Sequence, residues 1–68
     1  MFKPRNFAEL CMALQTQVRC QIDAYEGVVK DIGFVGPRHY RVQLVKVVEI
    51  GTNTADGFMT LDFYDKAF

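Results

Sequence analysis

Hydrophobic residues near the start of the chain recur with the period of a helix. They stand at i, i+3, i+4 and i+7 and are Phe7, Leu10, Cys11 and Leu14. This spacing places one apolar stripe along about three helical turns. Asn6 precedes the stripe, and Glu9 stands three residues after Asn6, which is the spacing of a capping box. The pattern therefore predicts an amphipathic helix that begins after Asn6.

From residue 17 onward the hydrophobic period shortens to two, which is typical of strands with one wet face. The pattern predicts four strands, at residues 17–24, 28–35, 39–50 and 58–64. Glycine, proline and small polar residues separate them, with turns expected at 25–27 and 36–37 and a loop at 51–57. Three hairpin-like connections and a single helix favour strands that pair antiparallel with their neighbours in the chain.

The third strand changes its apolar face midway. Tyr40, Val42 and Leu44 share one parity, whereas Val45 and Val47 have the other. A long strand with this switch is usually bent. The chain is therefore expected to form one α+β domain over residues 1–68, with a short N-terminal helix packed on a four-stranded antiparallel meander or a small bent barrel.

A second set of apolar residues lies late in the chain. We expect these residues to face away from Tyr40, Val42 and Leu44. Barrel closure would bury them; otherwise they form an exposed patch, which on a protein surface marks a partner or self-association site. The predicted protein-interaction residues are Val45, Val47, Met59, Leu61, Phe63 and Phe68, and the expected partners are a larger protein and further copies of the chain.

Composition narrows the function classes. Half of the 68 residues are hydrophobic, and eight basic residues balance eight acidic ones. No apolar run is long enough to cross a membrane, and no secretory signal is recognisable, so a cytoplasmic location without a membrane partner is expected. The single histidine, His39, has no nucleophile at a local spacing, and Cys11 and Cys20 stand nine positions apart. We therefore expect no enzyme activity, no catalytic residues, no metal site and no cofactor.

One segment has the composition of a nucleic-acid contact. Arg38, His39, Tyr40 and Arg41 place basic groups around an aromatic ring at a predicted hairpin tip, a combination that can hold phosphates and stack a base. Residues 1–46 carry seven Lys or Arg and four Asp or Glu. Residues 47–68 carry one Lys and four Asp or Glu. The first part of the chain is thus positive and the last part is negative.

The order of elements resembles that of the Sm-like small barrels, including the bacterial RNA-chaperone type. The similar features are Phe7 and Leu10 on the helix, strands at 18–22 and 27–32, and the long third strand. The resemblance implies RNA binding by a ring of subunits. Two functions are therefore expected from the sequence. The first is a small non-enzymatic module that binds a larger protein as an inhibitor or adaptor, and the alternative is an RNA- or DNA-binding small barrel that uses Arg38–Arg41.

Overall fold

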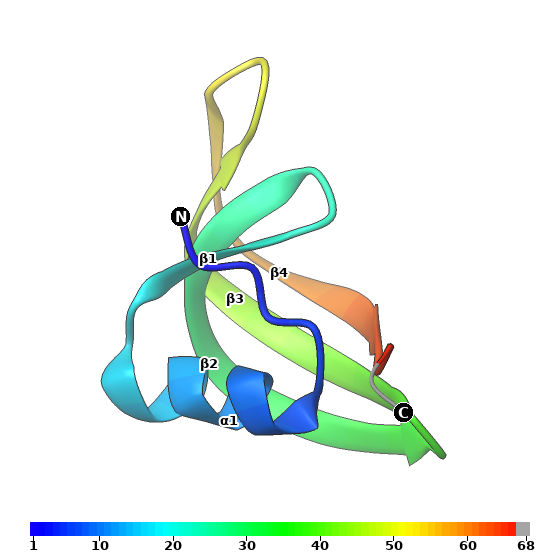
Figure 1. Cartoon of the computed structure of the whole chain (residues 1–68). Helices are drawn as coiled ribbons and strands as arrows, with labels where there is room; N and C mark the ends of the chain where they lie inside the picture. The colour runs from blue at the N-terminus through cyan, green and yellow to red at the C-terminus, as the bar shows by residue number, and fades with distance from the viewer. Residues whose placement is uncertain (67–68) are drawn as a thin grey trace.

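The computed structural model describes residues 1–66, apart from the side chain of Asp56. One helix precedes four strands (Figure 1), and the elements are α1 (Phe7–Thr16), β1 (Arg19–Ile22), β2 (Tyr25–Gly36), β3 (His39–Glu49) and β4 (Thr54–Tyr64). The strands form an antiparallel sheet in the order β1-β2-β3-β4. The predicted α+β class, with one short helix and an antiparallel sheet, is confirmed.

The helix begins where the sequence predicts. The Asn6 side chain accepts a hydrogen bond from the Glu9 amide at 2.9 Å, and Glu9 accepts in return from the amide of Arg5 at 2.8 Å. A carboxylate oxygen of Asp65 accepts from the Phe7 amide at 3.1 Å. These contacts satisfy amides that lack partners within the first helical turn. The helix ends at Thr16, and Gln17 closes it in the left-handed conformation, so Gln17 belongs to the cap and not to the first strand.

Two of the predicted connections differ from those in the structure. The turn between β1 and β2 lies at Asp23 and Ala24, because Ile22 already pairs with Tyr25. Asp23 has a φ of 55°, a left-handed conformation that aspartate tolerates in turns. The loop between β3 and β4 spans only residues 50–53 instead of 51–57. The turn after β2 lies at Pro37 and Arg38, which overlaps the predicted turn at 36–37 in one residue, because Gly36 still pairs with His39.

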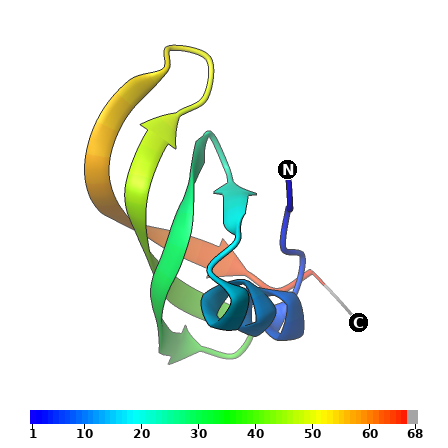
Figure 2. The same ribbon diagram turned by 90° about the vertical axis from the view of Figure 1, so that its left-hand side faces the viewer.

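The sheet bends sharply along its length (Figure 2). Lys46 has a φ of 54°, and the register of β3 with β4 shifts between Val45 and Val47. This bulge turns Val47 into the core, which explains the switch of apolar face within one strand. A guanidinium nitrogen of Arg19 donates to the Lys46 carbonyl at 2.9 Å. Within residues 1–66, β1 and β4 form no ladder with each other, so the bent sheet does not close into a barrel.

The core lies on the concave face of the sheet, beneath α1 (Figure 2). Leu10 and Ala13 of the helix are fully buried there. Three rows of side chains run across β2, β3 and β4 on this face, and they are Phe34, Tyr40 and Phe63; Ile32, Val42 and Leu61; and Val29, Leu44 and Met59. The helix covers one part of this face. The part formed by β4 borders the gap in the sheet.

Candidate interaction surface

The predicted protein-interaction residues do not form one exposed patch. Val47 and Phe63 are core residues, with 1% and 6% of their surfaces exposed, so their predicted exposure is wrong. Met59 and Leu61 are half-buried and pack against the core. Val45 is half-buried, and Phe68 lies outside the described residues. The late apolar set therefore contributes mainly to folding.

The predicted separation of the two apolar sets is also wrong. Phe63 pairs with Tyr40, and Leu61 pairs with Val42. Side chains of residues that pair across neighbouring strands project on the same side of the sheet. The concave face therefore carries Met59, Leu61 and Phe63 together with the first apolar set, although the sequence pattern predicted the two sets on opposite faces. The first set is Tyr40, Val42 and Leu44.

The predicted nucleic-acid segment splits between the core and the surface. Tyr40 is buried, and its ring stacks on Phe7 with the ring centroids 4.8 Å apart. His39 lies on the convex face, where its ring stacks on that of Tyr64 at 4.4 Å. The Nε2 atom of His39 is 3.0 Å from a carboxylate oxygen of Asp62. The segment thus provides no free aromatic ring at position 40.

The two arginines of this segment also lie near acceptors within the chain. A guanidinium nitrogen of Arg38 donates to the Asp65 carbonyl at 3.3 Å, and Nε of Arg41 is 4.0 Å from Asp62. The acidic late part of the chain is folded against the basic hairpin tip. Phosphate binding requires an excess of positive charge, and these acidic neighbours reduce it.

The outer edge of β4 is the feature that the sequence did not identify. The amide of Asp65 points toward β3, where it donates to the Arg38 carbonyl at 2.8 Å. The next amide, that of Lys66, points the opposite way. Backbone polar groups alternate in this manner along an antiparallel strand, and the register is unbroken from His39–Tyr64 to Val45–Phe58. Amides and carbonyls of Phe58, Thr60, Asp62 and Tyr64 therefore face away from β3, toward the gap.

A short N-terminal segment spans one end of this gap. The carbonyl of Phe2 accepts from the Gln21 amide of β1 at 2.9 Å, and the carbonyl of Arg5 accepts from the Lys66 amide at 3.1 Å. Phe2 also forms a parallel bridge with Cys20. We call the gap between β1 and β4 the seam. At this end the seam holds one extended segment, which is hydrogen-bonded on both sides.

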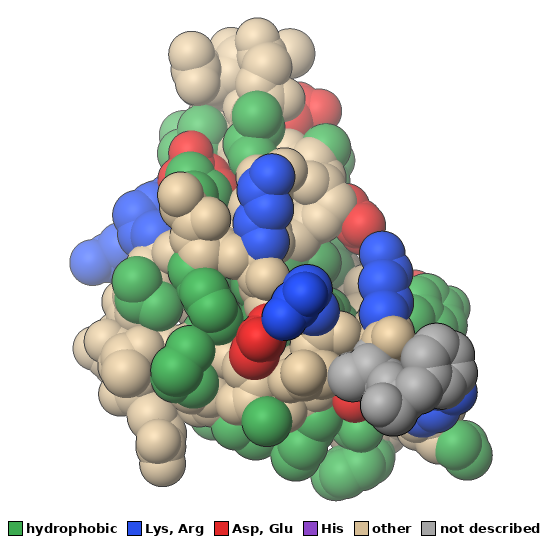
Figure 3. Space-filling view, viewed as in Figure 1, with side chains coloured by type: hydrophobic (Ala, Val, Ile, Leu, Met, Phe, Trp, Pro, Cys, Tyr) green, Lys and Arg blue, Asp and Glu red, His purple; other side chains and the backbone are tan. Residues whose placement is uncertain are grey.

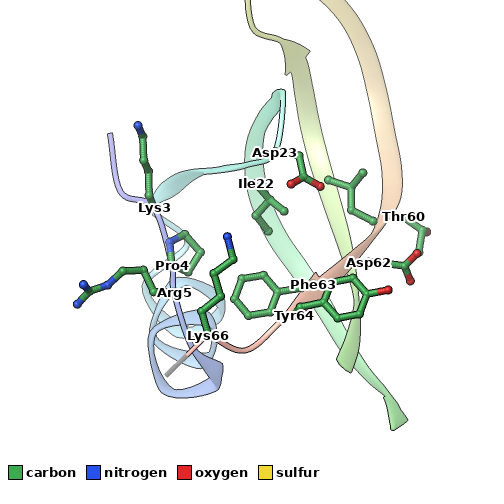
Figure 4. Close-up of a pocket in the computed structure, with 11 residues that line it drawn as sticks. Lys3, Pro4, Arg5, Ile22, Asp23, Thr60, Asp62, Phe63, Tyr64 and Lys66 are labelled. Atoms are coloured by element: carbon green, nitrogen blue, oxygen red, sulfur yellow. The ribbon is translucent and has the colours of Figure 1, made fainter. Parts of the chain in front are cut away.

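Beyond the N-terminal segment the seam widens into a hollow of about 590 Å³ (Figure 4). Ile22, Leu61 and Phe63 supply its apolar lining. In Figure 4, the side chains of Lys3, Arg5 and Lys66 lie on one side, and those of Asp23 and Asp62 lie on the other. Figure 3 shows basic side chains over the region where Figure 1 places the N-terminal segment and the end of β4.

Several aromatic side chains are strongly exposed. On β4, Phe58 and Tyr64 are 62% and 58% exposed, and both project on the convex side beside the open edge. Phe34 is 78% exposed at the end of β2, although its ring still contacts Phe7 and Tyr40 at centroid distances of 5.8 and 5.2 Å. Exposed aromatics of this kind are enriched at protein interfaces.

The cysteines have different environments. Cys20 is fully buried, and this burial raises the pKa of its thiol above the ordinary value of 9.0, although the charge of Arg19 acts in the opposite direction. Cys11 is half-buried on α1. Across residues 1–66, no three His, Cys, Asp or Glu side chains lie close enough together to hold a metal ion. In the same part of the chain, no helix has both the length and the apolar character needed to cross a membrane.

Comparison with known proteins adds no relative to this description. No protein-family model, no curated protein and no solved structure matches this chain.

Proposed function

We propose that this chain is a small non-enzymatic interaction module that binds a larger protein, as an inhibitor or adaptor. The observation that supports this proposal is the outer edge of β4, which presents unpaired backbone groups beside a hollow with both apolar and charged lining residues. An unpaired strand edge is a template for another extended chain. Binding here requires no catalytic group.

The composition of β4 supports a binding role for its edge. Proteins commonly protect an exposed edge with lysine, proline or a very short strand. Residues 54–64 contain neither lysine nor proline, and β4 is 11 residues long. The exposed rings of Phe58 and Tyr64 flank the edge on its convex side. An edge with this character is suited to contact with another protein.

The charge distribution favours a protein partner over nucleic acid. The whole chain has a formal net charge of zero, and Asp62 lies beside both His39 and Arg41. Non-specific affinity for RNA or DNA comes largely from neutralising phosphates. A neutral chain with an acidic residue at its basic tip provides little of this energy.

The proposal can be tested with two substitutions at one position. The amide of Thr60 faces the seam, so Thr60→Pro removes an edge donor without removing a β3–β4 hydrogen bond. Thr60→Ala keeps the amide and serves as the control. Wild-type protein and Thr60→Ala should capture the same protein from an extract of the source cells, and Thr60→Pro should lose it while keeping the wild-type circular dichroism spectrum.

Equal capture by all three proteins would show that the edge is not the binding site. Co-purification of RNA or DNA would instead support the alternative, provided that its retention weakens steeply with salt and disappears in an Arg38→Ala, Arg41→Ala double variant. Such a result would contradict the proposed function.

A further inference from the structure

We infer that the seam binds one extended segment of the partner protein, which runs antiparallel to β4 and carries acidic residues in its amino-terminal half. This inference rests on the proposed function and specifies how the partner is bound. It follows from the width of the seam, the direction of the strands around it and the charges on its rim.

The width follows from the segment that already lies in the seam. The N-terminal segment bonds to β1 through the Phe2 carbonyl and to the end of β4 through the Arg5 carbonyl. The seam at this end is therefore wide enough for one extended chain. The hollow of about 590 Å³ lies next to this end, with Ile22 of β1 and Leu61 of β4 among its lining residues. A partner strand placed there continues the arrangement that the chain itself adopts.

The direction follows from the pairing preference of strands. Phe2 forms a single parallel bridge with Cys20 of β1, which gives the direction at that residue only. A partner segment that extends this bridge is parallel to β1 and therefore antiparallel to β4, because these two strands run in opposite directions in the meander. Antiparallel pairing is also slightly more stable per residue. The seam-facing groups of Thr60, Asp62 and Tyr64 then form hydrogen bonds with alternate residues of the partner segment.

The side chains of the partner are constrained by the pleat of a strand. Successive side chains point to opposite faces, so every second residue of the bound segment faces the lining formed by Ile22, Leu61 and Phe63. These positions require apolar residues. The intervening positions lie on the convex side, beside the exposed rings of Phe58 and Tyr64.

The charge preference follows from the basic rim. Lys66 follows the carboxyl end of β4, and an antiparallel partner places its amino-terminal end there. Neither Lys3 nor Lys66 forms a side-chain hydrogen bond or ion pair among the described residues. The exposed side chain of Arg5 also lines the hollow, with its guanidinium 3.6 Å from the Glu9 carboxylate. Acidic residues in the amino-terminal half of the partner segment would pair with these groups, which gives the segment one orientation in the seam.

The test uses a phage-displayed library of random nine-residue peptides, selected against the immobilised full chain. Selected peptides should show apolar residues at alternate positions and acidic residues in their amino-terminal half. A Lys3→Gln, Lys66→Gln double variant should bind such a peptide about tenfold more weakly. Lys30→Gln is the matched control, because Lys30 is an exposed lysine outside the lining of the hollow, and it should leave the affinity unchanged.

Amide hydrogen exchange locates the bound peptide. Binding should slow exchange at Thr60, Asp62 and Tyr64, whereas Leu61 and Phe63 already direct their amides toward β3 and should change little. The inference is overturned if selection yields no peptide with this pattern, if affinity does not depend on the two lysines, or if the seam-facing amides are not protected. It is also overturned if the chain dimerises in light scattering and dimerisation alone protects these amides, because a second copy then occupies the seam.

Failure of this inference can be distinguished from failure of the proposed function. If capture of the protein partner is lost in Thr60→Pro but the double lysine variant binds with unchanged affinity, the proposed function stands and the acidic extended segment is rejected. If Thr60→Pro still binds both the partner protein and the peptide, the inference and the proposed function are both rejected.

Discussion

Gly27 of β2 lies close against the bend of β3, and replacing it with alanine tests the described bend. A Cβ atom at this position would lie 2.8 Å from the Val45 carbonyl oxygen and 3.3 Å from a methyl group of Val47. The first contact is with backbone, so a side-chain rotation cannot relieve it. The two strands must separate to accommodate the new methyl group.

The cost can be estimated from these contacts. Inserting a methyl group into a well-packed core typically costs about 1–3 kcal/mol. Alanine also restricts the unfolded chain relative to glycine, which offsets roughly 0.4–1 kcal/mol of this cost to the free energy of unfolding. We therefore expect Gly27→Ala to lower the free energy of unfolding by about 1–2 kcal/mol. For a domain of this size that loss corresponds to a melting temperature roughly 4–16 °C lower.

Gly33→Ala provides the matched control, because Gly33 lies on the same strand. Its Cβ would lie 3.8 Å from the Arg41 carbonyl oxygen, which is an ordinary contact. We expect unchanged stability or a gain of about 0.4–1 kcal/mol, measured for both variants by urea unfolding followed by circular dichroism. Equal stability losses in the two variants, or no loss in Gly27→Ala, would refute the close approach of β2 and β3 at the bend.

Three further predictions concern the helix and the cysteines. Leu10→Ala should cost about 2–5 kcal/mol in urea unfolding, whereas Leu14→Ala, at a half-buried position, should cost less; an equal or reversed order would contradict the described face of α1. Asp65→Ala should cost about 0.5–2 kcal/mol because the Phe7 amide loses its acceptor, and an unchanged melting temperature would argue against this cap. Native protein should react with iodoacetamide at Cys11 before Cys20. The free energy of unfolding should also fall above pH 9, because the Cys20 thiol ionises in the unfolded chain while its raised pKa keeps it protonated in the folded chain. This contribution to the pH dependence should be absent from Cys20→Val.

Local patterns in the sequence predicted local structure well. The start of α1 follows from Asn6 and Glu9, whose side chains form the expected type of cap, with Glu9 bonded to the amide of Arg5. The bend in β3 follows from the change of apolar parity between Leu44 and Val47, which the bulge at Lys46 produces. In both cases the signal lies within a few residues of the structure that it predicts.

The incorrect interaction patch follows from one error in loop length. A loop at 51–57 would place Leu61 opposite Val47, whereas the shorter loop places it opposite Val42. The difference is five residues, and an odd shift moves every side chain to the other face of the sheet. Hydrophobic spacing within β4 contains no information about this register. The prediction therefore assigned Met59, Leu61 and Phe63 to the wrong face.

The seam could not be located from the sequence, because it depends on contacts between distant residues. The outward direction of the Thr60 amide is evident only from the opposite bonding of Asp65 and Lys66. The basic rim likewise brings Lys3 together with Lys66, at the two ends of the described chain. The pattern of four strands allowed either an open meander or a small bent barrel, and it did not indicate which edge remains open or what lines it.

The bond between the Phe7 amide and Asp65 joins residues 58 positions apart. The helix ends at Thr16, so a ribosome adding about 5–20 residues per second completes it roughly 2.5–10 seconds before it supplies Asp65. During that interval the first amide of α1 lacks its final acceptor, and the strands that bury Leu10 are still being made. Until the last strand arrives, α1 therefore has only the local cap formed by Asn6 and Glu9, so its final cap and its burial are late events in the synthesis of this chain.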